Sequence, residues 1–74
     1  MTADRIKKGE YAQIEALEPS EFAVYLMEMG FMPGKRITML HQAPLAGPIA
    51  FKLENSIIAL RKSEARAIRV FLEH

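Results

Sequence analysis

The stretch Ile49-Ala50-Phe51-Lys52-Leu53-Glu54-Asn55-Ser56-Ile57-Ile58-Ala59-Leu60-Arg61 decides the fold class of this chain. Its first half alternates large apolar residues with small or charged ones, which is the period of a half-buried strand. Asn55-Ser56 predicts a tight turn, and residues 57–61 predict a second strand. The stretch is therefore a β-hairpin, and strands dominate the fold.

Three further segments with the period of a strand flank this hairpin. Residues 11–17 and 35–41 precede it, residues 68–72 follow it, and the alternation is imperfect only at Leu40. Five short strands in an open sheet would leave exposed edges, and closure into a barrel removes them. We therefore predict a mainly β fold, a small barrel of five or six short strands with one or two short α-helices.

One amphipathic helix is predicted between the first two strands. Ser20 is the candidate N-cap residue, Glu21 complements the helix dipole, and apolar residues recur at helical spacing over residues 22–29. Gly30 can end the helix in a left-handed conformation. Residues 63–66 are long enough for one more helical turn.

Two segments with proline and glycine interrupt the strands. Residues 31–34 predict a type II turn, because Pro33 presets the first corner and Gly34 can adopt the positive φ that follows. Residues 43–48 form a longer loop that exposes apolar groups of restricted conformation.

Length and composition limit the function. Seventy-four residues make one domain, residues 1–74, and 50% hydrophobic with 26% charged residues is typical of a folded globular chain. The chain has no cysteine and two histidines, so we expect no disulfide, no metal site and no cofactor. A net charge of +1 gives no general attraction to nucleic acid.

No motif indicates an enzyme. Gly30 to Lys35 is not a phosphate loop, because its glycine spacing is too short and Arg36 replaces the required Ser or Thr. His41 is the one credible imidazole and has no carboxylate near it in the sequence. The glutamates are interspersed with apolar positions like a solvated face, so no catalytic residue is predicted.

The ends of the chain carry no targeting or membrane signal. Residues 42–51 are the longest stretch without a charged residue or histidine, but prolines and a glycine interrupt it and it is too short to span a bilayer. We expect a cytoplasmic protein without membrane insertion. Leu72-Glu73-His74 matches the junction between an expression vector and a histidine tag, and is interpreted as such a remnant.

The apolar residues exceed what a small core needs. Four of the five methionines lie near the end of the predicted helix and the strand that follows, and methionine is common at surfaces that accept another protein. Together with the proline loop they predict a docking surface for a protein partner. This surface consists of Met29, Phe31, Met32, Pro33, Leu45 and Pro48.

The densest basic cluster lies within residues 61–69. Barrels that bind nucleic acid combine such residues with exposed aromatic side chains. Here Phe71 is the one nearby aromatic residue, and Glu64 dilutes the charge. The cluster is interpreted as a solvated rim first and as a partner contact second.

Four pieces in chain order resemble the FeoA family of ferrous iron transport. They are Leu26-x-x-Met29-Gly30-Phe31-x-Pro33-Gly34, Ile37, Ala43-Pro44-Leu45-x-Gly47-Pro48-Ile49, and Ile58-Ala59-Leu60-Arg61-x-x-Glu64-Ala65-x-x-Ile68-x-Val70. The resemblance runs from about Tyr11 to Val70. It implies an SH3-like small barrel, in agreement with the predicted strands.

The resemblance also implies a role. Family members are small cytoplasmic proteins that act with FeoB, a membrane ferrous-iron transporter with a cytoplasmic G-domain. We expect an accessory or regulatory protein, with Arg36 and Arg61 as candidates for an arginine supplied to that G-domain. Two positions depart from the family pattern. Ala46-Gly47-Pro48 stands where Gly-Asp-Pro is usual, so the acidic residue of the loop is missing, and Asn55 replaces the usual hairpin glycine while tolerating its left-handed conformation.

Other interpretations stay open. A similar barrel forms the regulatory domain of iron- and manganese-dependent repressors, although Met1 and the short chain favour a free protein. A nucleic-acid-binding barrel would show salt-dependent binding to single strands. Exposed strand edges would also allow two copies to associate. Whether the protein activates or inhibits a transporter does not follow from the sequence.

Overall fold

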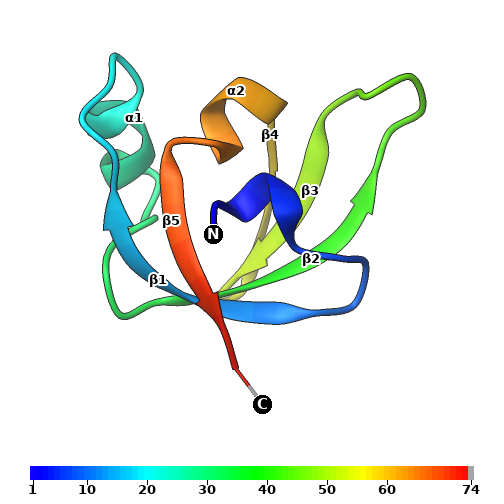
Figure 1. Cartoon of the computed structure of the whole chain (residues 1–74), viewed down its shortest axis with the longest axis horizontal. Coiled ribbons are helices and arrows are strands. Elements are labelled where there is room, and N and C mark those ends of the chain that lie inside the picture. Colours follow the sequence, from blue (N-terminus) through cyan, green and yellow to red (C-terminus); the bar gives the residue numbers. More distant parts are fainter. Residues whose placement is uncertain (74) are drawn as a thin grey trace.

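The computed structural model describes residues 1–73, so His74 of the predicted vector remnant lies outside the described residues. Its strands are β1 (Tyr11–Leu17), β2 (Arg36–Gln42), β3 (Ile49–Leu53), β4 (Ser56–Leu60) and β5 (Ile68–Leu72). They form one antiparallel sheet in the order β4-β3-β2-β1-β5, which curls into a small barrel (Figure 1). The helices are α1 (Ala23–Glu28) and α2 (Lys62–Ala65), and a 3₁₀ turn covers Ala3–Arg5. The predicted mainly β barrel is confirmed.

Within residues 1–73, one edge of the sheet is covered by the chain and the other edge is unpaired. The backbone of Met1 exchanges hydrogen bonds with Val70, and Thr2 bridges to Arg69, so the first residues of the chain cover the edge of β5. Within residues 1–73, no strand pairs with the outer edge of β4. The connection through α2 crosses the top of the barrel in Figure 1. The N-terminal turn and its pairing with β5 were not predicted from the sequence.

Alternate residues of the strands fill one hydrophobic core. Ile37 and Phe51 are fully buried, as the period of two requires for residues on the inner face. The side chains with less than 2% exposure are Phe31, Phe51, Ile14, Leu26, Ile37, Ile49, Leu60, Ile68 and Val70. Burial of each such side chain contributes about 1.5–3 kcal/mol, so packing alone holds this cysteine-free fold.

The irregular residue Leu40 lies at a β-bulge. Met39 pairs with Phe51 and His41 with Ala50, so Leu40 is an extra residue on β2. One extra residue interrupts the hydrogen-bond ladder and increases the local bend of the strand. The imperfect alternation in the sequence therefore marks a bend of the barrel.

Helix α1 begins later than predicted. Its N-cap position is Phe22, without a capping side chain, while the Ser20 hydroxyl accepts a hydrogen bond from the Phe22 N–H at 3.1 Å. The predicted N-cap role of Ser20 is therefore wrong, because Ser20 closes the turn before the helix. The predicted ending is confirmed, since Gly30 has φ +104° and the N–H groups of Gly30 and Phe31 bond to the carbonyls of Met27 and Leu26, each at 3.0 Å. This is a Schellman motif.

Positive φ angles test two predicted turns. Gly34 has φ +90°, as the type II turn requires, and the Lys35 N–H bonds back to the Met32 carbonyl at 3.1 Å. In the hairpin, Leu53 pairs with Ser56, so the turn residues are Glu54 and Asn55, and the left-handed residue is Glu54 with φ +55°. The turn therefore lies one residue earlier than predicted, and Asn55 does not take the left-handed conformation.

Candidate functional site

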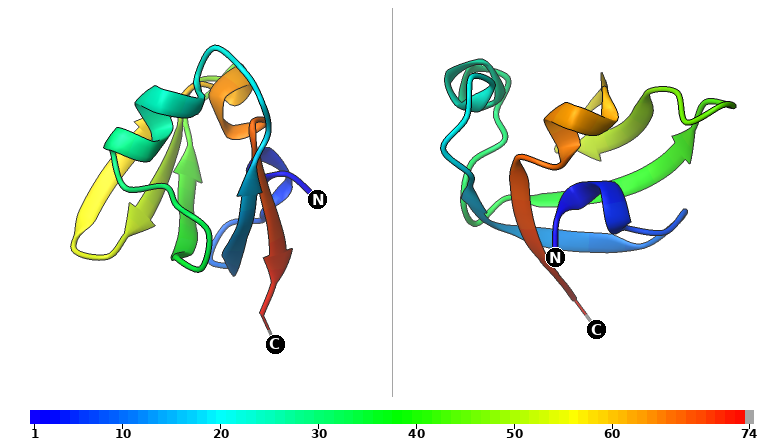
Figure 2. Two further views of the ribbon diagram at one scale, coloured as in Figure 1. Left: turned by 90° about the vertical axis from the view of Figure 1, so that its left-hand side faces the viewer. Right: turned by 45° about the horizontal axis from the view of Figure 1, so that its top comes forward.

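The structure separates the predicted docking surface into two regions. Helix α1 with the turn after it lies at one side of the barrel, and the β2–β3 loop, residues 43–48, lies at the opposite side (Figures 1 and 2). Met32 and Pro33 belong to the first region, and Leu45 and Pro48 belong to the second. The six predicted residues therefore do not form one continuous surface.

One of the six residues cannot contact a partner in the folded protein. Phe31 is fully buried and belongs to the core, so its assignment to a docking surface is wrong. Met29 is half-buried and packs against the core, while Met32 is 40% exposed and Pro33 is exposed. In this turn Phe31 is therefore buried in the core, and Met32 is exposed to solvent.

Helix α1 adds apolar surface that sequence reasoning did not assign. The side chains of Val24, Tyr25 and Met27 are 68%, 48% and 51% exposed. In the helix itself, Leu26 is the buried residue. A helix with five apolar residues among six cannot bury its whole circumference against one barrel. We define the α1 face as Val24, Tyr25, Met27, Met32 and Pro33.

The β2–β3 loop presents a leucine at a strained tip. Leu45 is fully exposed, and Leu45 and Ala46 both have positive φ, at 61° and 56°. The left-handed conformation costs about 1–2 kcal/mol for each such residue. The loop is closed by local bonds, from the Ala43 N–H to the Pro48 carbonyl at 2.9 Å and from the Gly47 N–H to the Ala43 carbonyl at 3.1 Å.

Glycine at position 47 is a steric requirement of this loop. A Cβ atom there would lie 2.8 Å from the Ala43 Cβ, closer than real Cβ contacts allow. The Gln42 amide also donates to the Gly47 carbonyl at 3.1 Å. The loop therefore holds a defined shape with Leu45 outermost.

The two predicted arginines differ in their contacts. Arg36 forms an ion pair with Glu73 at 2.6 Å, and its guanidinium lies 4.7 Å from the centre of the Tyr11 ring. Arg61 is exposed at the start of α2, where its backbone N–H donates to Glu64 at 2.7 Å. Among residues 1–73 the Arg61 guanidinium has no ion-pair partner. Arg61 is thus the more available of the two.

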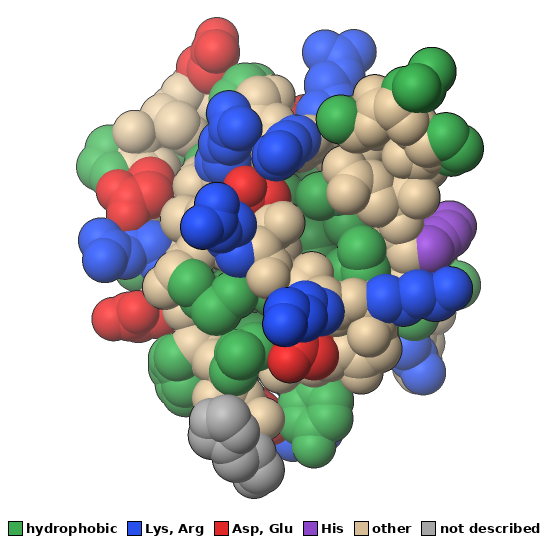
Figure 3. All heavy atoms as spheres, turned by 45° about the vertical axis from the view of Figure 1, so that its right-hand side comes forward, with side chains coloured by type: hydrophobic (Ala, Val, Ile, Leu, Met, Phe, Trp, Pro, Cys, Tyr) green, Lys and Arg blue, Asp and Glu red, His purple; other side chains and the backbone are tan. Residues whose placement is uncertain are grey.

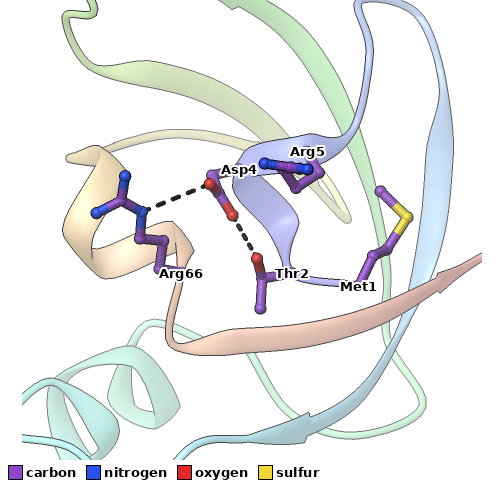
Figure 4. A pocket seen from close by; sticks show the side chains of 5 residues that line it. All are labelled: Met1, Thr2, Asp4, Arg5 and Arg66. Atoms are coloured by element: carbon purple, nitrogen blue, oxygen red, sulfur yellow. Dashed lines mark hydrogen bonds and ion pairs between the residues drawn. The ribbon is translucent and has the colours of Figure 1, made fainter.

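A shallow hollow lies beside the N-terminal turn (Figure 4). It is lined by Met1, Thr2, Asp4, Arg5 and Arg66. The Asp4 side chain is 5% exposed; it accepts a hydrogen bond from the Thr2 hydroxyl and lies 3.7 Å from the Arg66 guanidinium. These contacts tie the 3₁₀ turn to the end of α2, because a buried carboxylate needs partners.

The described residues contain neither a cluster of metal-ligating side chains nor a helix that could span a membrane. In the part of the chain that the structure describes, no three His, Cys, Asp or Glu side chains are grouped so that they could hold a metal ion. The helices of that part are all too short to cross a membrane.

Comparison with known proteins identifies the family. A model of the FeoA domain matches residues 1–71. A protein of Porphyromonas gingivalis, the Fe(2+) transport protein A/Fe(2+) transporter FeoB fusion protein, is 33% identical over 73 residues. The match covers 97% of this chain and 9% of that protein, so this chain spans a small part of its length.

Solved structures share the fold. Iron(II) transport protein A from Clostridium thermocellum is 42% identical with a TM-score of 0.91, over 97% of this chain and 45% of that chain. Stenotrophomonas maltophilia FeoA, solved in complex with zinc and described as a prokaryotic SH3 domain protein, is 28% identical with a TM-score of 0.85, over 96% of this chain and 89% of that chain. The predicted SH3-like fold is confirmed.

A repressor shares the fold alone. A manganese-dependent transcriptional repressor has a TM-score of 0.89 at 17% identity, over 99% of this chain and 36% of that chain. Its sequence similarity is weaker than that of the FeoA proteins. The matched domain model and the FeoA relatives agree, and this chain belongs to the FeoA family.

Proposed function

We propose that this protein is a cytoplasmic accessory protein of ferrous iron uptake, which acts by binding a FeoB-like membrane transporter and not by catalysis. The observation that carries this proposal is the Porphyromonas gingivalis protein, in which a segment similar to 97% of this chain belongs to a fusion with the transporter FeoB. A fusion keeps two domains at high effective concentration. A separate chain would need a non-covalent contact in its place.

The α1 face is the proposed site of this contact. It combines an aromatic side chain with two exposed methionines, and such residues are enriched at protein interfaces. The buried residues Leu26 and Phe31 anchor it to the core, so a partner would meet a preformed surface. Leu45 and Pro48 form a second, separate contact at the tip of the β2–β3 loop.

Arg61 is the proposed contact to the G-domain of the transporter. Its guanidinium has no ion-pair partner within residues 1–73, whereas the Arg36 guanidinium lies over the ring of Tyr11. An arginine supplied in trans can stabilise the charge of the transition state of GTP hydrolysis. If Arg61 acts in this way, Arg61→Ala will lower the stimulated rate of GTP hydrolysis and leave binding nearly unchanged. An unchanged rate would remove this role.

The test is a titration of this protein against the full-length transporter and against its isolated G-domain, with and without GTP. We expect Met32→Asp to weaken binding at least about tenfold, because it places a charge in the centre of an apolar contact. The control is Ile57→Asp, since Ile57 is 70% exposed on β4, outside the α1 face. Circular dichroism should show that both variants are folded.

The possible outcomes distinguish an error in the proposed contact surface from an error in the proposed function. Binding of wild type that Met32→Asp does not weaken would place the contact elsewhere on the barrel. Binding only to the full-length transporter would assign the contact to its membrane portion and remove the G-domain role. Absence of binding to either protein would overturn the proposed function and favour a regulatory domain of the repressor type.

A further inference from the structure

The net charge of +1 conceals an uneven distribution of charge. Residues 1–10 and 61–66 contain six basic and three acidic side chains, a net charge of +3, and the other residues contain four basic and six acidic ones, a net charge of −2. We call the six basic side chains the basic face. They are Arg5, Lys7, Lys8, Arg61, Lys62 and Arg66.

The structure brings these two segments together. The 3₁₀ turn contacts α2 and β5, and Arg5 and Arg66 line the same hollow beside it (Figure 4). Figure 3 shows Lys and Arg side chains gathered over the centre of one face of the molecule. Basic side chains of both segments, Arg5 and Arg66, therefore lie around one hollow of the surface.

The acidic side chains of these segments are less exposed than the basic ones. Asp4 is held by Thr2 and Arg66, Glu10 accepts a hydrogen bond from the Lys7 backbone N–H at 2.9 Å, and Glu64 accepts one from the Arg61 backbone N–H at 2.7 Å. All three acidic residues are partly buried, whereas all six basic residues are exposed. The outermost charges are therefore positive.

We propose that the basic face binds the anionic headgroups of phospholipids at a bilayer surface. The centre of a protein interface is usually rich in apolar and aromatic side chains. Within residues 1–10 and 61–66, Met1 is the one large hydrophobic side chain described as exposed. Long basic side chains without an apolar centre suit a layer of phosphates, to which each basic residue adds attraction within a Debye length.

This proposal goes beyond the proposed function and does not depend on it; the two share Arg61, which the variants of the lipid test leave unchanged. Lipid contact through these side chains needs neither insertion nor the α1 face, and Figure 2 places α1 away from the N-terminal turn. A vesicle of pure lipid contains no transporter. Failure of one proposal therefore leaves the other intact.

The test is co-sedimentation of the full chain with vesicles of phosphatidylglycerol and phosphatidylcholine, and with vesicles of phosphatidylcholine alone. We expect binding to the anionic vesicles only, weakened several-fold when salt rises from about 50 to about 200 mM. Lys7→Glu/Lys8→Glu should weaken binding on the order of thirtyfold, because two attractive charges near the surface become repulsive.

A matched variant tests whether the position of the basic residues matters or only the net charge of the protein. Lys35→Glu/Lys52→Glu gives the same net charge but lies outside the basic face, and its exposed Lys35–Glu54 pair contributes little to stability. We expect it to bind within about threefold of wild type. Equal loss in both variants would show that net charge alone matters and would overturn the basic face. If the wild-type protein did not bind anionic vesicles at about 50 mM salt, the proposed lipid contact would be overturned and an acidic protein partner would be favoured.

Discussion

Two apolar regions of this protein reach the surface in opposite ways. The segment from α1 to Gly34 is anchored by the buried side chains of Leu26 and Phe31 and ends its helix on a glycine with positive φ. The β2–β3 loop contains no fully buried residue and places Leu45 and Ala46 in the left-handed conformation instead. The first region is apolar because a short helix cannot bury all its sides, and the second because a strained loop holds a leucine outward.

Removal of the Phe31 side chain, which anchors the first region, should give the largest loss of stability. Phe31→Ala removes a fully buried aromatic side chain, and we expect the free energy of unfolding to fall by about 3–5 kcal/mol. A domain of this size has a total stability of that order, so much of the variant should be unfolded. Urea titration followed by circular dichroism measures this. Met32→Ala is the control, because that side chain is 40% exposed. Equal stability of the two variants would contradict the anchoring role.

The helix end should give a smaller effect. Gly30→Ala forces alanine into φ +104° and puts a Cβ 3.3 Å from Leu53, so we expect a loss of about 1–2 kcal/mol. Gly9→Ala is a matched comparison, because Gly9 has φ +85° and an added Cβ would meet no atom within 4 Å. The difference between the two unfolding free energies isolates the contact with Leu53. A Gly30→Ala variant as stable as wild type would remove the requirement for glycine.

In the β2–β3 loop the reverse substitution, alanine to glycine, should increase the free energy of unfolding. Ala46→Gly releases the left-handed strain at φ 56°, and we expect a gain of about 0.5–1 kcal/mol after the added backbone entropy is subtracted. Ala59→Gly, at an exposed strand position without positive φ, should instead lose stability by a similar amount. Thermal unfolding of both variants gives the comparison. A loss in both would show that the loop is not strained.

The tip of the loop should matter least for stability. Leu45 is fully exposed, so Leu45→Ser should change the free energy of unfolding by less than about 0.5 kcal/mol. In the transporter titration it should reduce binding less than Met32→Ser does. A larger reduction would make the loop, and not the α1 face, the main contact.

Local patterns predicted the elements well because their causes are local. The period of two located β1 and β5 at their observed bounds, and Gly34 marked its turn because only glycine adopts φ +90° without cost. The irregular Leu40 marked a bulge. The hairpin turn was placed one residue late, because Glu54 accepts the left-handed strain that the sequence assigned to Asn55.

The candidate site was less predictable because it depends on distance in space. Phe31 and Met32 are adjacent apolar residues, and the closure of the barrel over the turn determines that the first is buried and the second exposed. The β2–β3 loop and α1 both belong to the apolar excess, but the curl of the sheet carries them to opposite sides. Val24 and Met27 were detectable as surplus apolar residues of a short helix.

The sequence by itself determined the mainly β barrel, the glycine positions at two turns and the family, because hydrophobic period and backbone permissiveness are properties of neighbouring residues. The tertiary structure alone decided which apolar residues are exposed and which charged segments lie together. Burial and electrostatic fields depend on contacts between segments far apart in the chain, such as the first ten residues and α2. The net charge of +1 therefore does not show that the first residues and α2, both rich in basic side chains, lie together in the folded protein.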